Sequence, residues 1–127
     1  MLKSLKLTNV GPAPEMQLDF SERLNLITGD NGLGKSFLLD VAWWALTRKW
    51  PREINDQITS GYPAKPPFPN RDSFIEFELK AKAKTVKYKS IYGRKEQAWI
   101  GKSGRPPMPG LVIYAQADGG FSVWDPA

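Results

Sequence analysis

Apolar and polar residues alternate along two stretches near the start of the chain, and this pattern predicts two strands. Residues 5–8 alternate weakly and lead into a turn at residues 9–12. Residues 16–20 alternate more clearly and place three apolar side chains on one face. Residues 24–28, Leu-Asn-Leu-Ile-Thr, then predict a third strand that is short and buried.

A helical pattern follows, because residues 36–48 are apolar almost all the way round a helical wheel. Such a helix is typical of a buried position between layers, and Asp40 is its one acidic residue. The pair Trp43-Trp44 is interpreted as core, and Trp50-Pro51 is expected to end the helix. Residues 51–70 contain five prolines and no clean period, which indicates either a surface insertion or a functional loop.

The period changes to two in the second half of the chain, where short segments alternate without a helix between them. These predicted strands lie at residues 73–80, 85–92, 96–100, 111–116 and 121–124. Strands that follow one another through hairpins form an antiparallel meander rather than a parallel doubly wound sheet. The expected fold is therefore an α/β (α+β) lobe with a mixed to antiparallel sheet around one buried helix.

A glycine-rich motif joins the third predicted strand to the helix. It is Gly29-Asp30-Asn31-Gly32-Leu33-Gly34-Lys35-Ser36, which matches the P-loop pattern G-x-x-x-x-G-K-S. The glycines let the backbone approach a polyphosphate and turn its N–H groups toward it. Lys35 is expected to contact the terminal phosphates, and the Ser36 hydroxyl is expected to hold Mg²⁺. A structural glycine turn is the alternative, but the order strand, glycine loop, helix favours nucleotide binding.

Composition narrows the chemistry that this site can use. The chain of 127 residues contains no cysteine and no histidine, which excludes disulfides, cysteine metal sites and a histidine general base. Hydrolysis would then depend on phosphate and magnesium chemistry or on carboxylates. No apolar run is long enough to span a membrane, and the N-terminus has no signal-peptide core, so a cytoplasmic protein is expected.

The net charge of +5 is concentrated in one segment, because residues 80–105 carry nine basic residues and one acidic residue. One interpretation is a solvated hairpin face whose lysines protect an exposed edge. The other is a surface that contacts nucleic-acid phosphates. The candidates for that contact are Lys82, Lys84, Lys87, Lys89, Arg94 and Lys95.

Residues 5–10, 18–20 and 24–36 together closely resemble the N-terminus of SMC/RecF-type ATPase heads. These are ABC-like P-loop ATPases, often labelled AAA-family ATPases, that act in DNA maintenance, DNA repair and anti-phage defence. The resemblance implies ATP and Mg²⁺ as ligands of residues 29–36, with a further backbone N–H from Phe37. Asn9 matches the asparagine that ends the first strand in this family. Leu33 departs from it, because a small residue is usual at that position.

The resemblance also identifies parts of such heads that this sequence lacks. They need a Walker B strand that ends in Asp-Glu and a glycine-rich signature motif, and neither is present. Gln116 could be compared with the family's Q-loop glutamine, but it falls in a predicted hairpin. We therefore expect residues 1–127 to be the N-terminal lobe of an incomplete domain, with parts at residues 1–50, 51–70 and 71–127.

Such a lobe would bind ATP but hydrolyse it only when completed by the other half of the head or by a second subunit. The complete head is expected to form a head-to-head dimer, with DNA as a further partner. The alternative is a non-catalytic subunit that binds nucleotide or nucleic acid and serves assembly.

Overall fold

The computed structural model describes residues 1–27, 34–54, 62–68, 70–81, 83–101, 111–115 and 121–124. The chain divides into two compact units, each built from two chain segments. The first unit comprises Met1–Lys35 and Ala64–Ser103, and the second comprises Ser36–Pro63 and Gly104–Ala127. The boundary between the units therefore falls inside the glycine-rich motif.

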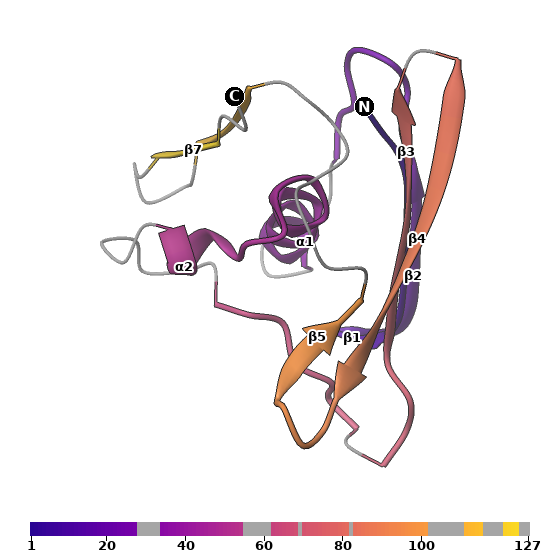
Figure 1. Ribbon diagram of the computed structural model, residues 1–127, viewed down its shortest axis with the longest axis vertical. Helices are drawn as coiled ribbons and strands as arrows, with labels where there is room; N and C mark the ends of the chain where they lie inside the picture. The colour runs from indigo at the N-terminus through magenta and orange to yellow at the C-terminus, as the bar shows by residue number, and fades with distance from the viewer. Residues whose placement is uncertain are drawn as a thin grey trace. The chain divides into compact units, whose positions relative to one another are not determined.

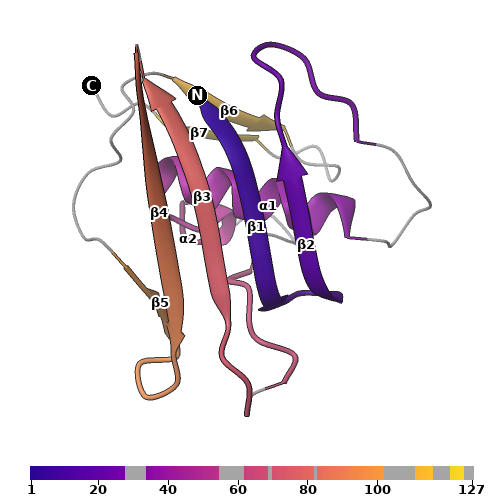
Figure 2. The ribbon, with the colours of Figure 1, turned by 90° about the vertical axis from the view of Figure 1, so that its right-hand side faces the viewer.

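The first unit contains a five-stranded sheet in which each described pair of neighbours is antiparallel (Figures 1 and 2). Its strands are β1 (Leu2–Val10), β2 (Ala13–Asp19), β3 (Phe74–Ala81), β4 (Lys84–Gly93) and β5 (Ala98–Ile100). The spatial order is β2-β1-β3-β4-β5, so the first strand lies between its hairpin partner and a strand from much later in the chain. The expected α+β class with an antiparallel sheet is confirmed.

Alternation along the strands buries one face of this sheet, as the period of two predicts. Leu5 and Leu7 of β1 lie opposite Phe77 and Ile75 of β3, and each of the four side chains is at most 2% exposed. Phe77 also stacks on Tyr88 of β4, with ring centroids 5.2 Å apart. Full burial of such an aliphatic or aromatic side chain stabilises a fold by about 1.5–3 kcal/mol, so this face is the core of the first unit.

Asn9 ties the end of β1 to the loop that precedes β3. Its backbone has a positive φ of 53°, a conformation that asparagine tolerates better than most residues. Its side-chain Nδ2 donates to the carbonyl oxygens of Phe68 and Arg71 at 2.9 and 3.2 Å, and to Ser73 Oγ at 2.9 Å. The Ser73 hydroxyl donates back to the Asn9 carbonyl oxygen at 2.8 Å. One buried amide thus fixes a loop that comes about 60 residues later, a separation typical of contacts that only folding creates.

The second unit contains two helices and a separate two-stranded antiparallel sheet. The helix α1 (Lys35–Thr47) begins at the last residue of the first unit, and α2 (Pro51–Ile54) follows it closely. The strands β6 (Val112–Ala115) and β7 (Phe121–Trp124) pair with each other. The predicted meander is therefore divided, because β6 and β7 do not join the five-stranded sheet.

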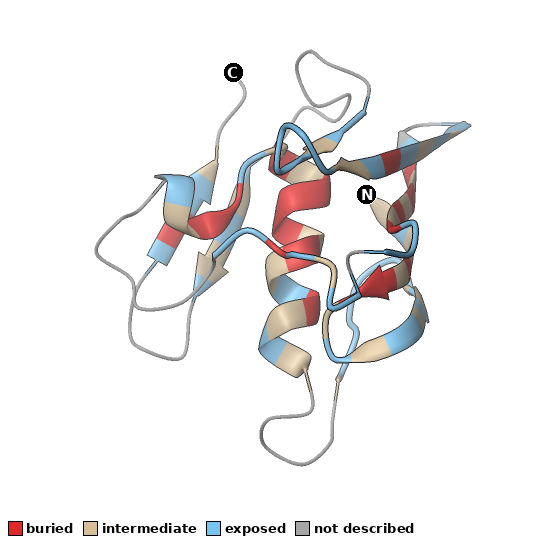
Figure 3. Cartoon of the chain, turned by 90° about the horizontal axis from the view of Figure 1, so that it is seen from below, coloured by how far each residue is buried: buried red, intermediate tan, exposed pale blue. Residues whose placement is uncertain are grey.

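The helix predicted at residues 36–48 is confirmed by α1, with each end shifted by one residue. Trp43 and Trp44 are 3% and 6% exposed, so they are core residues as expected, and buried positions run along α1 in Figure 3. Trp44 also stacks on Trp50, with centroids 5.5 Å apart. The helix is not buried on every side, because Leu39 is 46% exposed. The left-handed φ of 65° at Arg48 marks its end.

The buried strand predicted at residues 24–28 is wrong over the part that the structure describes. Residues 24–27 form no strand, and Leu24 and Leu26 are 84% and 86% exposed. Local hydrogen bonds compete with strand pairing here. The Ser21 backbone N–H donates to Asn25 Oδ1 at 2.8 Å, and the Ser21 hydroxyl donates to the Leu24 carbonyl oxygen at 2.6 Å.

The proline-rich stretch is also more ordered at its start than predicted. Pro51 is the first residue of α2, a position where its missing N–H costs nothing and its fixed φ suits a helix. No helix among the described residues is long and apolar enough to cross a membrane.

Removal of the Asn9 amide is expected to destabilise the first unit. Asn9→Ala should lower the free energy of unfolding by about 2–4 kcal/mol, because buried carbonyl oxygens lose their donors and alanine is strained at positive φ. Asn9→Gly should lose about 1 kcal/mol less, since glycine accepts this φ without strain. Urea unfolding measures both values. Asn9→Ala within about 0.5 kcal/mol of the wild type would contradict the role given to this amide.

Candidate nucleotide-binding site

The structure describes the last three residues of the glycine-rich motif, which are Gly34, Lys35 and Ser36. Residues 29–33 lie outside the described residues. Lys35 is the first residue of α1, and Ser36 in its first turn is exposed. The first N–H groups of a helix lack partners within it and carry a partial positive charge, so this end suits a phosphate. Phe37, the further residue expected to contribute an N–H, lies in the same turn and is half-buried.

Gly34 is required by its conformation and by its surroundings. Its φ is +86°, in the left-handed region that favours glycine. A Cβ built on Gly34 would lie 2.9 Å from Pro12 Cγ, closer than real Cβ contacts allow. Pro12 belongs to the turn between β1 and β2, where Gly11 also has a positive φ of 77°. The turn next to Asn9 thus packs directly against the end of the motif.

Asp40, one helical turn after Ser36, accepts a hydrogen bond from Tyr114, a residue that the sequence analysis did not predict to belong to the site. The Tyr114 hydroxyl, from β6 of the same unit, donates to Asp40 Oδ1 at 2.7 Å and lies 3.5 Å from the Ser36 carbonyl oxygen. Burial raises the pKa of Asp40 above its ordinary value, and the hydrogen bond from Tyr114 acts in the opposite direction. The Tyr114 ring lies 6.1 Å from that of Trp43. Strand alternation predicted β6, but no local pattern reveals a partner 74 residues away.

The lysines of β4 lie opposite carboxylates of β3. Lys87 pairs in register with Glu78, and Lys87 Nζ lies 3.6 Å from Glu78 Oε1. Lys89 pairs in register with Glu76. Part of the charge that was expected to attract nucleic acid is therefore balanced on the neighbouring strand. Lys82 and Gln116 lie outside the described residues.

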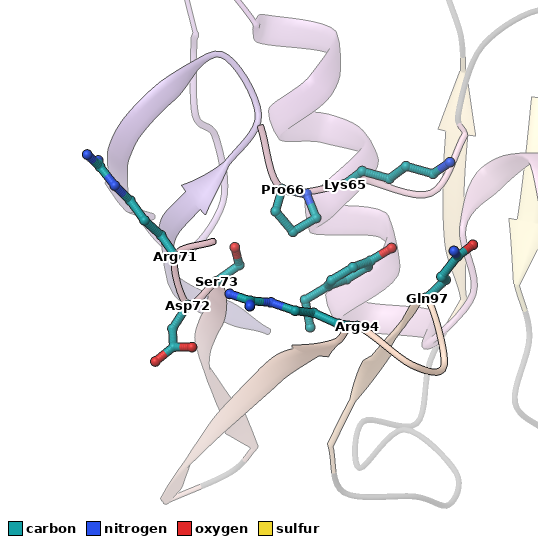
Figure 4. A pocket seen from close by; sticks show the side chains of 8 residues that line it. Lys65, Pro66, Arg71, Asp72, Ser73, Arg94 and Gln97 are labelled. Atoms are coloured by element: carbon teal, nitrogen blue, oxygen red, sulfur yellow. The ribbon is translucent and has the colours of Figure 1, made fainter. Parts of the chain in front are cut away.

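The other basic residues that were predicted to contact nucleic acid lie away from these carboxylates. Lys84 begins β4 and is exposed, and Lys95 is exposed in the turn between β4 and β5. Arg94 lies in the same turn and lines a pocket of about 300 Å³, together with Lys65 and Arg71 from the loop before β3 (Figure 4). Among the described residues, no group of three or more histidine, cysteine or acidic side chains could hold a metal ion.

Comparisons with known proteins identify the family of this chain. A family model described as "AAA domain" matches residues 4–105 of this chain. The protein "DNA replication and repair protein RecF" of Clostridium kluyveri is 25% identical over 104 residues, which cover 82% of this chain and 25% of that protein. The RecF protein of an Exiguobacterium species is 35% identical over 63 residues, which cover 50% of this chain and 17% of that protein.

These matches confirm the predicted resemblance to SMC/RecF-type ATPases. The chain spans a quarter or less of the length of the two RecF proteins.

Gly34→Ala is expected to lower the free energy of unfolding by about 1–3 kcal/mol, because alanine is strained at this φ and its Cβ meets Pro12. Pro12→Ala in addition removes the steric part, so the double variant should recover some of the loss but not all of it. Pro12→Ala alone is the matched control. Urea unfolding of the wild type, the two single variants and the double variant gives the coupling free energy between the two positions. A Gly34→Ala variant as stable as the wild type would contradict both the strain expected at this φ and the steric contact with Pro12.

Asp40 should make stability depend on pH. Because its pKa is raised in the folded state, its contribution is fully present below the ordinary value of 3.8 and is lost as pH rises through the folded pKa. Asp40→Asn keeps an oxygen for the Tyr114 hydroxyl without the buried charge. Its Tm should exceed that of the wild type at neutral pH, and the difference should shrink as pH falls toward the ordinary value. A difference that does not change with pH would contradict this assignment.

Proposed function

Because the chain belongs to the AAA domain family, we propose that it is the ATP-binding N-terminal lobe of a RecF-like ATPase that acts in DNA repair. The observation that carries the proposal is the geometry at the end of the motif. A glycine at positive φ directly precedes a helix whose first residue is the motif lysine. This is the arrangement that brings backbone N–H groups and one ammonium group to a polyphosphate.

The residues of this end have separate roles in the proposal. Lys35 supplies positive charge to the terminal phosphates, while the first N–H groups of α1, that of Phe37 included, bind phosphate oxygens. The exposed Ser36 hydroxyl is available as a ligand for Mg²⁺, whose charge offsets that of the phosphates when it is bound. Pro12 closes the space beside Gly34, so any side chain at that position would meet it. Residues 29–33 complete the loop in this proposal.

Tyr114 and Asp40 support the first turn of α1. The hydrogen bond between them joins β6 to the helix one turn beyond Ser36. We assign them a positioning role, because the Tyr114 hydroxyl also approaches the Ser36 carbonyl oxygen. Such outer contacts orient the residues that bind a metal or a ligand.

We infer that the chain binds ATP without hydrolysing it at a significant rate. The sequence contains no adjacent Asp-Glu pair after an apolar run, and it has no histidine to serve as a general base. Hydrolysis would then require residues from the rest of a RecF-like head. The names of the two relatives favour DNA repair over anti-phage defence as the setting.

Lys35→Ala tests the proposal. A charge-assisted hydrogen bond contributes about 1.5–3 kcal/mol, and 1.4 kcal/mol is a factor of ten, so the Kd for ATP with Mg²⁺ should rise at least about tenfold. Fluorescent ATP analogues or calorimetry measure this Kd. Lys49→Ala is the matched control, because Lys49 is an exposed lysine just beyond the other end of α1.

Equal affinities of the wild type and Lys35→Ala, or no saturable ATP binding by the wild type, would overturn the nucleotide site. Steady turnover by the wild-type chain that disappears in Lys35→Ala would leave the site intact but contradict the absence of hydrolysis.

A further inference from the structure

Residues 24–27 leave two apolar side chains in water shortly before the glycine-rich motif. Leu24 and Leu26 are 84% and 86% exposed, and Ile27 is half-buried. The segment belongs to the first unit, and none of the described strands includes it. In an extended chain the two leucines would share one face, because side chains alternate with a period of two. The segment thus has a strand pattern that its observed conformation does not use.

Hydrogen bonds between Ser21 and the segment hold it in this conformation. The Ser21 backbone N–H donates to Asn25 Oδ1 at 2.8 Å, and Asn25 Nδ2 donates to the Ser21 carbonyl oxygen at 3.2 Å. The Ser21 hydroxyl donates to the Leu24 carbonyl oxygen at 2.6 Å and lies 3.1 Å from Asn25 Oδ1. We call these contacts the Ser21–Asn25 lock. They are exposed to solvent, where water can replace each partner, so the net contribution of each bond is small.

The strand β2 offers the segment an open edge within the same unit. It is the first strand in the spatial order of the five-stranded sheet, so the described strands pair with it on one side only. Met16 and Leu18 lie opposite Leu7 and Leu5 of β1, but they and Phe20 are only half-buried. In the view of Figure 2, the chain turns back after β2 and passes on the side away from β1. A further strand at this edge would cover these apolar side chains.

The hydrophobic pattern selects one register for such a strand. If residues 21–23 form a three-residue hairpin loop, Leu24 lies opposite Phe20 and Leu26 lies opposite Leu18. All four side chains then face the core side of the sheet. A shift of one residue would turn both leucines to the solvent face.

This strand and the Ser21–Asn25 lock exclude each other. In the selected register Asn25 lies opposite Asp19, which is two residues before Ser21 and so about 7 Å from it along the strand. The Asn25 side chain then leaves the Ser21 N–H and carbonyl oxygen that it now contacts. The observed form keeps exposed hydrogen bonds and leaves two leucines in water, whereas the strand would bury the leucines and lose those bonds.

We propose that residues 24–27 change from the locked form to a sixth strand on β2 when nucleotide binds at the motif, and this assignment rests on the proposed function. The motif begins at Gly29, two residues beyond Ile27, and α1 fixes its other end from Lys35 onward. A strand on the near side fixes the first end as well, which gives the order strand, glycine loop, helix. A ligand that binds this ordered loop more tightly shifts the segment toward the strand.

Asn25→Val tests the lock through ATP affinity. Valine removes the amide that contacts Ser21 and favours a strand. One net hydrogen bond corresponds to a factor of about 2–10, so the Kd for ATP with Mg²⁺ should fall by about threefold or more. Ser21→Ala should change the Kd in the same direction. Thr85→Val is the matched control, because Thr85 is an exposed residue of β4 outside the lock, and its Kd should stay within about twofold of the wild type.

A disulfide reports the sixth strand directly, because the chain has no cysteine of its own. Gln17→Cys/Ile27→Cys places thiols on opposed residues of the proposed register, with Cα atoms about 5 Å apart, which a disulfide can span. Glu15→Cys/Ile27→Cys is the control, because its thiols are two residues out of register and about 7–8 Å apart. Under mild oxidation the opposed pair should cross-link faster than the control pair, and at least about threefold faster again with ATP.

One arm of the experiment does not depend on the nucleotide site. Asn25→Val added to the opposed pair should speed cross-linking even without ATP. Cross-linking no faster than in the control pair, with and without Asn25→Val, would overturn the sixth strand.

The coupling to nucleotide has its own outcomes. Cross-linking that ATP leaves unchanged would overturn the coupling, and so would an equal or higher Kd in an Asn25→Val variant that circular dichroism shows to be folded. If the wild type does not bind ATP, the coupling fails together with the proposed function, which Lys35→Ala tests separately. The cross-linking rates without nucleotide still decide whether the strand forms.

Discussion

The hydrogen bonds of one buried amide organise the first unit. Asn9, the residue before the last one of β1, has a left-handed backbone conformation, and its Nδ2 donates to three acceptors of the loop before β3. On one side, this arrangement fixes the backbone that carries Arg71. On the other side, β1 ends one residue later in the turn whose Pro12 packs against Gly34. One residue of β1 therefore lies between the loop before β3 and the turn beside the glycine-rich motif.

Local patterns predicted the elements whose causes are local. Alternation in β3 places Ile75, Phe77 and Leu79 in the core, and the apolar run of α1 places its tryptophans there. The demand for glycine at position 34 also followed from the motif alone. These features need only a residue's neighbours in sequence, because period, helix-end chemistry and turn conformation act over a few residues.

The remaining features depend on contacts between distant segments. The insertion of β1 between β2 and β3 and the hydrogen bond from Tyr114 to Asp40 join residues more than 60 positions apart. A count of charges along the chain likewise missed that Glu76 and Glu78 lie beside the β4 lysines. The segment that contains Leu24 and Leu26 was predicted to be a buried strand, but both side chains are exposed, and Ser21 and Asn25 form local hydrogen bonds instead. Sequence periodicity reports which side chains avoid water and does not report which segments become neighbours.

The contact between Pro12 and Gly34 has a consequence for how this sequence can diverge. The two positions share one small volume although 21 residues separate them in the chain. Substitutions at the two positions are not independent, because a change at one position alters which residues the other position can accommodate. Selection on the glycine-rich motif would then extend to a hairpin turn that contains none of the motif residues. Among homologous chains, the imprint would be covariation between these two positions rather than conservation of the motif alone.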